Sequence, residues 1–249
     1  MDRFRCSGVV LSAVDYGDSD RIVTFLTDDR GRLSAFARGA RKSKRRFAGA
    51  LEPFTLLTLQ LAESRGSVHR LDGVEVLDGF GELRTDIGKV ARAAYACELM
   101  RELCREQEPH PDLFALLVRF LQALAREGAA SLALMRFELL ALGMAGLMPT
   151  LEACGRCGDA ATDDALFDPE HGGLVCPSCA LRGAAAATPG AREAARALVR
   201  VQRARAGETL EFEPHVKAQA RAMLSRFVAH HLGKRLKSLD FMRDVGVEA

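Results

Sequence analysis

Short runs rich in valine, leucine and phenylalanine, separated by turn residues, dominate the first 80 residues of the chain. Such residues favour strands, whereas Asp, Asn and Gly clusters favour turns. The pattern predicts five strands, at residues 7–14, 21–27, 32–38, 54–61 and 68–77. Five short strands at this spacing are typical of a small barrel or sandwich. A five-stranded barrel of the OB type fits the count, and an SH3-like barrel or an open sheet fits it nearly as well.

After residue 80 the apolar residues recur every third or fourth position, which marks one face of a helix. The spacing predicts helices over residues 83–104, 111–128, 131–149, 191–205 and 214–237. Pro111 suits a first helical turn, Ser131 is a suitable N-cap, and Pro149 is expected to end the third helix. We therefore expect a helical bundle to follow the barrel.

Four of the seven cysteines form two Cys-x-x-Cys pairs in a segment with few large apolar residues. The pairs are Cys154 with Cys157 and Cys176 with Cys179. A two-residue gap lets a tight turn point both sulfurs at one ion, and the 18 residues between the pairs suit a short hairpin, as in a zinc ribbon. We predict that the four cysteines bind one structural Zn²⁺, since four thiolates leave no position open for water.

Other readings of the cysteines stay open. The four could be free thiols or two reversible disulfides, and His171 within the hairpin could replace one thiolate. The other three cysteines, Cys6, Cys97 and Cys104, are scattered, and two lie on the apolar face of the first predicted helix, so we expect buried core thiols.

A strongly basic stretch lies mostly in the predicted loop between the third and fourth strands. From Gly31 to Leu51 there are seven basic residues and no acidic one. They are Arg32, Arg38, Arg41, Lys42, Lys44, Arg45 and Arg46. Each Lys or Arg that neutralises a phosphate releases condensed counterions, which favours binding. We predict that these residues bind the backbone of DNA, and a solvated loop is the alternative.

Over the whole chain, 35 Lys and Arg stand against 33 Asp and Glu, a net charge of +2 that excludes a uniformly basic, histone-like protein. A second basic segment, residues 214–239, has six basic residues and no acidic one. They are Lys217, Arg221, Arg226, Lys234, Arg235 and Lys237. We predict an accessory DNA or partner contact there, with a solvated helix face as the alternative. The rest of the chain is therefore acidic.

Aromatic residues near the basic loop are few, and the chain has no Trp. They are Tyr16, Phe25, Phe36 and Phe47. Barrels that bind single strands often stack bases on aromatic rings. We expect Phe25 and Phe36 to be core residues, so that stacking contributes little.

Signals for catalysis and for membrane insertion are missing. There is no Walker-type loop, nucleophile elbow or His-Glu-x-x-His motif. Asp15, Asp18 and Asp20 are expected to be solvated turn carboxylates. No apolar run reaches the length of a membrane span or signal peptide, and the cysteine usage fits a reducing compartment, so we expect a cytoplasmic protein. A metal-dependent nuclease stays as an alternative, as does an adaptor whose basic loop binds an acidic partner.

Several runs of residues resemble the RecO family of recombination-mediator proteins of DNA repair. They are Gly8–Leu11 leading into Tyr16–Thr27, Gly31–Leu33 through Arg38–Lys42, Leu51–Phe54, Leu139–Pro149 leading into the cysteine pairs, and Lys237–Leu239. The resemblance covers nearly the full length and is most specific from Gly8 to Phe54.

This resemblance implies a multidomain α and β protein. Its expected parts are an OB-fold DNA-binding domain at residues 1–80, an α-helical domain at 81–150 and 183–249, and an embedded zinc-ribbon-like module at 151–182. It implies binding to single- and double-stranded DNA and annealing of complementary strands, without catalysis. It also implies partnership with RecR and with the acidic C-terminal tail of single-stranded-DNA-binding protein during RecA loading, at the nucleoid.

Overall fold

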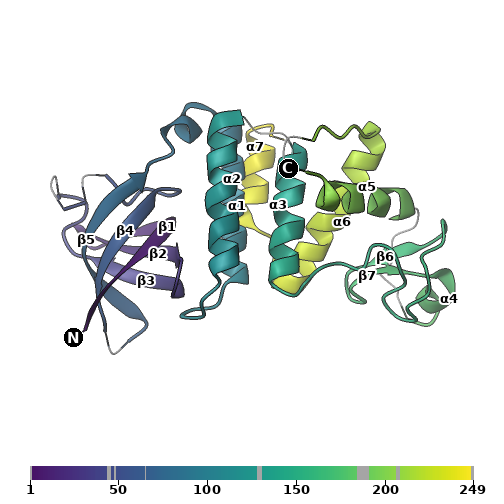
Figure 1. Cartoon of the computed structure of the whole chain (residues 1–249), viewed down its shortest axis with the longest axis horizontal. Coiled ribbons are helices and arrows are strands. Elements are labelled where there is room, and N and C mark those ends of the chain that lie inside the picture. Colours follow the sequence, from purple (N-terminus) through teal and green to yellow (C-terminus); the bar gives the residue numbers. More distant parts are fainter. Residues whose placement is uncertain are drawn as a thin grey trace. The chain divides into compact units, whose positions relative to one another are not determined.

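Five strands close into a barrel in the computed structural model of the chain (Figure 1). They are β1 (Arg3–Tyr16), β2 (Asp20–Thr27), β3 (Gly31–Ala37), β4 (Leu56–Ala62) and β5 (Val68–Asp78). The order around the barrel is β1-β2-β3-β5-β4, with β3 and β5 parallel and the other neighbours antiparallel. This closed five-stranded arrangement is that of an OB fold. The predicted OB barrel is confirmed, and the open sheet is excluded.

The structure describes residues 2–43, 46–47, 49–64, 66–127, 131–183, 191–205 and 208–247. By its internal contacts the chain divides into two compact units. The first comprises Met1–Ala129 and Ser238–Glu248, and the second comprises Ala130–Lys237. The first unit is therefore discontinuous in the sequence.

Inward side chains of alternating strand positions fill the barrel. In β3, buried Leu33, Ala35 and Ala37 alternate with partly exposed residues, as expected for a strand with one face in a core. The loop after β3 adds two further side chains to this core, Phe47 and Leu51, each of which is 2% exposed. The C-terminal part of this loop thus packs into the barrel core.

Helices complete the first unit. They are η1 (Gly81–Thr85), α1 (Ile87–Leu103), α2 (Pro111–Glu127) and, from Ser238 on, α7 (Lys237–Asp244). Asp86 interrupts the helix predicted over 83–104, because it adopts an extended conformation and its Oδ1 accepts a hydrogen bond from the Lys89 N–H at 3.0 Å. The Ser238 N–H donates to Glu98 Oε2 at 2.8 Å and so holds the start of α7 on α1.

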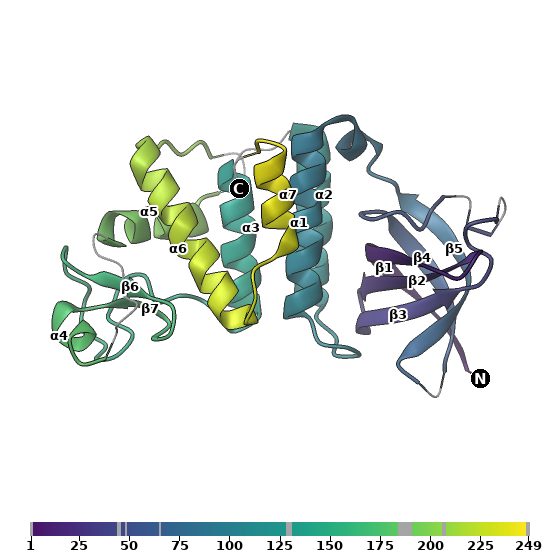
Figure 2. The same ribbon diagram turned by 180° about the vertical axis from the view of Figure 1, so that it is seen from behind.

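The second unit combines three longer helices with a small hairpin (Figure 2). They are α3 (Ser131–Met144), α5 (Ala191–Arg203) and α6 (Pro214–Leu232), with β6 (Leu166–Asp168), β7 (Gly173–Val175) and the short α4 (Pro177–Ala180) between α3 and α5. Among the helices of the described ranges, none is long and apolar enough to cross a membrane.

Two predicted helix ends were wrong, and a glycine explains each. α3 ends at Met144 instead of Pro149, because Gly146 takes a left-handed φ of 74° and Leu147 N–H donates to the Leu142 carbonyl at 2.7 Å. The helix predicted over 214–237 ends at Leu232, because Gly233 has a left-handed φ of 65°. The left-handed conformation after a helix end favours glycine, since glycine has no Cβ to clash with the backbone. The chain then starts the separate helix α7.

Candidate nucleic-acid interface and metal centre

Two hydrogen bonds hold the start of the basic loop, defined here as residues 38–46 between β3 and β4, against the β1–β2 turn and the first residue of β2. The Gly39 N–H donates to Asp20 Oδ1 at 2.7 Å, and the Arg41 N–H donates to the Ser19 carbonyl at 2.9 Å. Sequence reasoning missed this role, since Asp20 reads as a solvated turn carboxylate until its loop partner is known. The loop therefore starts from a fixed place on the barrel.

Four of the predicted DNA-binding residues are exposed on this loop: Arg38, Arg41, Lys42 and Arg46. The Arg46 Nη2 donates to the Arg38 carbonyl at 2.7 Å, and its guanidinium lies 5.0 Å from the centre of the Phe47 ring. The Arg41 Nε lies 3.3 Å from Asp15 Oδ2. The structure thus brings these four cations together on one loop. Lys44 and Arg45 lie outside the described residues.

Arg32 is placed apart from the basic loop. Its Nε donates to the Cys104 carbonyl at 3.0 Å, and its Nη2 lies 3.7 Å from Glu106 Oε1. Arg32 is the second residue of β3 and Arg38 follows its last residue, so the two lie roughly 20 Å apart at the usual rise per strand residue. Arg32 therefore joins the barrel to the segment after α1, and the structure does not bring it together with the loop cations.

The aromatic residues divide differently from the prediction. Phe25 is fully buried in the barrel, as expected. The prediction that Phe36 is a core residue was wrong, because Phe36 occupies an outward position of β3 and is only partly buried. Phe47 is buried beneath the loop. Of the loop's neighbours, Phe36 and Tyr16 thus remain accessible, with ring centroids 5.7 Å apart.

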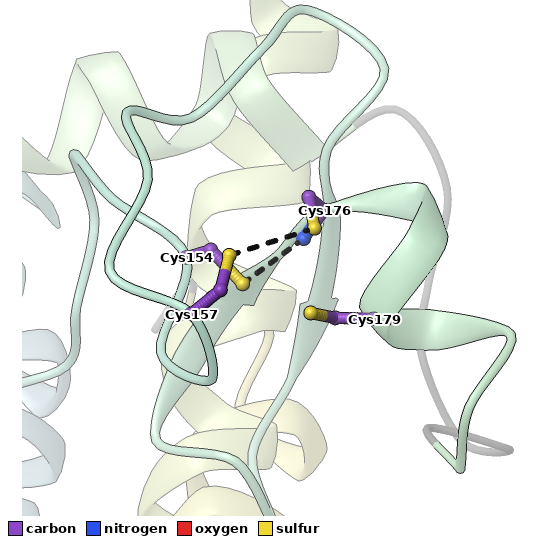
Figure 3. A group of neighbouring side chains, drawn as sticks. All are labelled: Cys154, Cys157, Cys176 and Cys179. Carbon is purple, nitrogen blue, oxygen red and sulfur yellow. Dashed lines mark hydrogen bonds between the residues drawn. The ribbon is translucent and has the colours of Figure 1, made fainter.

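The sulfurs of the two cysteine pairs converge beside the β6–β7 hairpin (Figure 3). The four Sγ atoms of Cys154, Cys157, Cys176 and Cys179 all lie within 4.8 Å of one another, and the Sγ atoms of Cys157 and Cys176 are 3.9 Å apart. A tetrahedron with metal–sulfur bonds of about 2.3 Å has sulfurs about 3.8 Å apart. The four cysteines could therefore hold one metal ion, as their spacing predicts.

Glycine and proline shape the two turns that carry these thiols. Gly158 closes the first turn with a left-handed φ of 80°, and its N–H donates to the Cys154 carbonyl at 2.9 Å. Gly155 lies so close to His171 that a Cβ there would be 2.3 Å from the His171 carbonyl oxygen. Cys176 is the N-cap of α4, with Pro177 in the first helical turn. The glycines and the proline in and beside the two Cys-x-x-Cys pairs thus suit the turns that position the thiols.

Backbone dipoles favour the thiolate form at the buried end of this cluster. Burial raises the pKa of Cys154, but the backbone N–H groups of Cys157, Cys176 and Arg156 outweigh burial and lower that pKa to about 6. The Arg182 Nη2 lies 3.3 Å from Cys179 Sγ. Both effects favour negative sulfur, which is the form that binds metal.

His171 is bound to another residue and does not take the place of a thiolate in the cluster. Its Nδ1 lies 2.8 Å from Oδ2 of the buried Asp168, so its ring is committed to a carboxylate. The three remaining cysteines are buried, as expected. Burial raises the pKa of Cys97 to about 12, which makes it an unreactive thiol.

The cysteine module packs on the helices of the second unit. The Phe167 ring of β6 lies 6.2 Å from the Phe227 ring of α6, and both side chains are buried. The Arg192 Nη1 of α5 donates to the Leu151 carbonyl at 3.1 Å. An ion held by the four thiolates would therefore stabilise the cysteine module, which packs against the helices of the second unit.

The six accessory basic residues differ in how far they are exposed. Arg221 points inward: its guanidinium donates to both carboxylate oxygens of Glu138, whose side chain is fully buried, with Nη2 to Oε1 at 2.6 Å. Lys217 is partly buried on α6, whereas four others are exposed. They are Arg226, Lys234, Arg235 and Lys237. Arg221 thus serves the interior of the second unit.

Comparison with known proteins agrees with this architecture. The barrel and the cysteine cluster define a chain of the OB-fold class with a helical part that could hold a metal ion. A family model described as "Recombination protein O N terminal" matches residues 1–80, and one described as "Recombination protein O C terminal" matches residues 84–240. The chain belongs to the RecO family of DNA repair proteins.

Full-length relatives support this assignment. A protein named "DNA repair protein RecO" from Myxococcus xanthus (strain DK1622) is 49% identical over 252 residues, which cover 100% of both chains. Proteins of the same name from Anaeromyxobacter sp. (strain K) and Geobacter sulfurreducens are 50% identical over 252 residues and 35% identical over 246 residues. The alignment with the Anaeromyxobacter protein covers 99% of this chain and 98% of that protein. The alignment with the Geobacter protein covers 98% of this chain and 99% of that protein.

Proposed function

We propose that this chain is a non-catalytic recombination mediator that binds single- and double-stranded DNA and anneals complementary strands. With RecR, it would help to load RecA at the nucleoid in the cytoplasm. Membership of the RecO family supports this proposal. The observation that carries it is the exposed basic loop, which Asp20 and Ser19 hold on the closed barrel.

The proposed mechanism is electrostatic. The guanidinium and ammonium groups of Arg38, Arg41, Lys42 and Arg46 would contact phosphates and leave the base edges free. Neutralising phosphates removes part of the repulsion between two strands, so that complementary bases can meet and pair. Lys44 and Arg45 extend the same charge along the sequence and belong to the proposal. Arg32 contributes to it only if its contacts with Cys104 and Glu106 open.

Removing loop cations should weaken DNA binding and flatten its dependence on salt. Each phosphate contact contributes about −0.9 to the slope of log K against log salt for duplex DNA. For the triple variant Arg41→Ala/Lys42→Ala/Arg46→Ala we expect weaker binding at low salt and a slope smaller by up to about 3. Gel shifts and strand annealing across salt concentrations measure both effects.

A charge-matched control comes from exposed arginines elsewhere in the first unit. The variant Arg105→Ala/Arg119→Ala/Arg126→Ala removes three charges and should leave the salt slope unchanged. Equal affinity of the loop variant and the native chain at low salt would contradict the mechanism. Cleavage of the labelled DNA with a divalent ion would indicate a nuclease instead. Binding of acidic peptides without any binding of DNA would indicate an adaptor.

We further infer that the ion of the cysteine cluster is Zn²⁺ in a structural site. Four thiolates in a tetrahedral arrangement are the donor set of structural zinc, and they complete the coordination of the ion. Metal analysis of the purified chain should give about one zinc per molecule. A chain that folds normally and contains no zinc would contradict this inference.

RecR and the acidic tail of single-stranded-DNA-binding protein are proposed partners on the strength of the family alone. The exposed cations Arg226, Lys234, Arg235 and Lys237, with Lys217, are the candidate accessory surface for such a tail or for DNA. Arg221 is a poor candidate because its guanidinium is bound to Glu138.

A further inference from the structure

Four apolar side chains face outward together on the barrel wall next to the basic loop. Val14 of β1 lies directly opposite Ile22 of β2, and Ile22 lies directly opposite Phe36 of β3. Tyr16 follows Val14 on the same face and meets the Phe36 ring edge-on, at 82° between the ring planes. We call these four residues the apolar patch.

This patch is accessible to solvent. Tyr16 is 58% exposed and Val14 is 63% exposed, whereas Ile22 and Phe36 are partly buried against their neighbours. The inward positions of the same strands, such as Val23 and Ala35, fill the barrel core, so the patch is not needed for that core. Contiguous exposed apolar side chains on a soluble barrel commonly mark a binding surface.

Three arginines belong to the segments next to the two rings. Arg38 follows Phe36 by two residues, just beyond the end of β3. Arg70 of β5 lies directly opposite Phe36, and its Nε lies 2.8 Å from Asp72 Oδ1. Arg41 of the basic loop contacts Asp15, the residue before Tyr16. An occupant of this surface must therefore offer a flat apolar face together with negative charge. Unpaired bases on a phosphate backbone have both properties.

We propose that bases of single-stranded DNA stack on Tyr16 and Phe36 while the basic loop holds the phosphates, which gives the barrel a preference for single strands over duplex. The proposal rests on the proposed function, because it concerns the same DNA-binding surface. Aromatic stacking accepts any base, so it adds affinity without sequence preference. In a duplex the bases are stacked on one another, and only the backbone reaches the loop. The patch therefore distinguishes the two forms of DNA, whereas the loop charges do not.

Tyrosine fluorescence can report this stacking directly. The chain has two tyrosines and no Trp, and Tyr95 is fully buried on α1, so accessible emission comes from Tyr16. Titration with a thymidine oligonucleotide should quench the emission. Duplex DNA and an abasic deoxyribose-phosphate chain of the same length should bind through the loop with little quenching.

Three variants separate the ring from the rest of the side chain. Tyr16→Ala should bind the single strand about 10-fold more weakly and the duplex within about 2-fold of the native chain. Tyr16→Phe keeps a ring and should keep the affinity while it loses the fluorescence response. Phe36→Leu keeps apolar volume and should behave like Tyr16→Ala. Val76→Ala, an exposed apolar position on β5, is the matched control and should change neither affinity.

The results distinguish this proposal from the proposed function. If the native chain binds neither form of DNA, the proposed function itself fails. If it binds both forms through the loop, but Tyr16→Ala leaves single-strand affinity unchanged and no quenching occurs, only the stacking proposal fails. An equal loss of affinity for both forms also overturns the preference.

Discussion

Arg221→Met is expected to destabilise the second unit by about 3–5 kcal/mol. The substitution removes the guanidinium that binds both oxygens of Glu138 and leaves a carboxylate whose side chain is fully buried. A buried carboxylate that loses its charged partner loses much of the compensation for leaving water. Urea unfolding, followed by circular dichroism of the helices, measures the loss.

Two controls make this result specific. Arg226→Met removes an exposed charge from the same helix and should change stability by less than about 1 kcal/mol, because exposed charge interactions contribute little. The double variant Glu138→Leu/Arg221→Met removes both charges and should recover most of the loss, because apolar pairs of similar volume often replace buried ion pairs. Equal stability of Arg221→Met and Arg226→Met would show that the ion pair contributes nothing.

Cys154→Ser is expected to abolish metal binding and to destabilise the second unit by an amount on the order of 5 kcal/mol. Structural zinc contributes its binding free energy to folding, and a weak hydroxyl ligand cannot replace a buried thiolate. The module carries Phe167 into contact with Phe227 of α6, so its loss should also loosen the helices. Metal content, together with limited proteolysis, measures both effects.

Ser178→Ala is the matched control for the metal site. Ser178 lies between the second pair of cysteines, and its hydroxyl is 3.2 Å from Cys176 Sγ, but all four thiolates remain in this variant. It should keep about one zinc per chain. Full metal content and normal protease resistance in Cys154→Ser would rule out the four-thiolate site. The same variant should retain DNA binding through the basic loop, since that loop belongs to the first unit.

The elements that local pattern determines were predictable. Strand alternation and turn residues placed the five strands of the barrel, and the two Cys-x-x-Cys pairs placed the four sulfurs that converge. Both signals are local, because a strand alternates with every residue and a Cys-x-x-Cys pair spans only four residues. Gly146 and Gly233 also carried a local signal, since glycine just beyond a periodic run commonly ends a helix.

Long-range pairing was not predictable from these patterns. Arg221 meets Glu138 across 83 residues of sequence, and Arg32 meets the Cys104 carbonyl across 72. A charge run reports how many cations a segment has but not which of them another segment neutralises. Phe36 shows the same limit for apolar residues, because hydrophobicity alone does not tell which face of a closed barrel a side chain occupies.

The discontinuity of the first unit has a consequence for how the chain folds during synthesis. The barrel, α1 and α2 are complete once residue 127 has been made, but α7 emerges only after the entire second unit. Glu98 of α1 can therefore accept the Ser238 N–H only after residue 238 has left the ribosome. Helix α7 thus joins the first unit after the second unit has been made, and a chain that stops before α7 leaves the first unit incomplete although all five barrel strands are present.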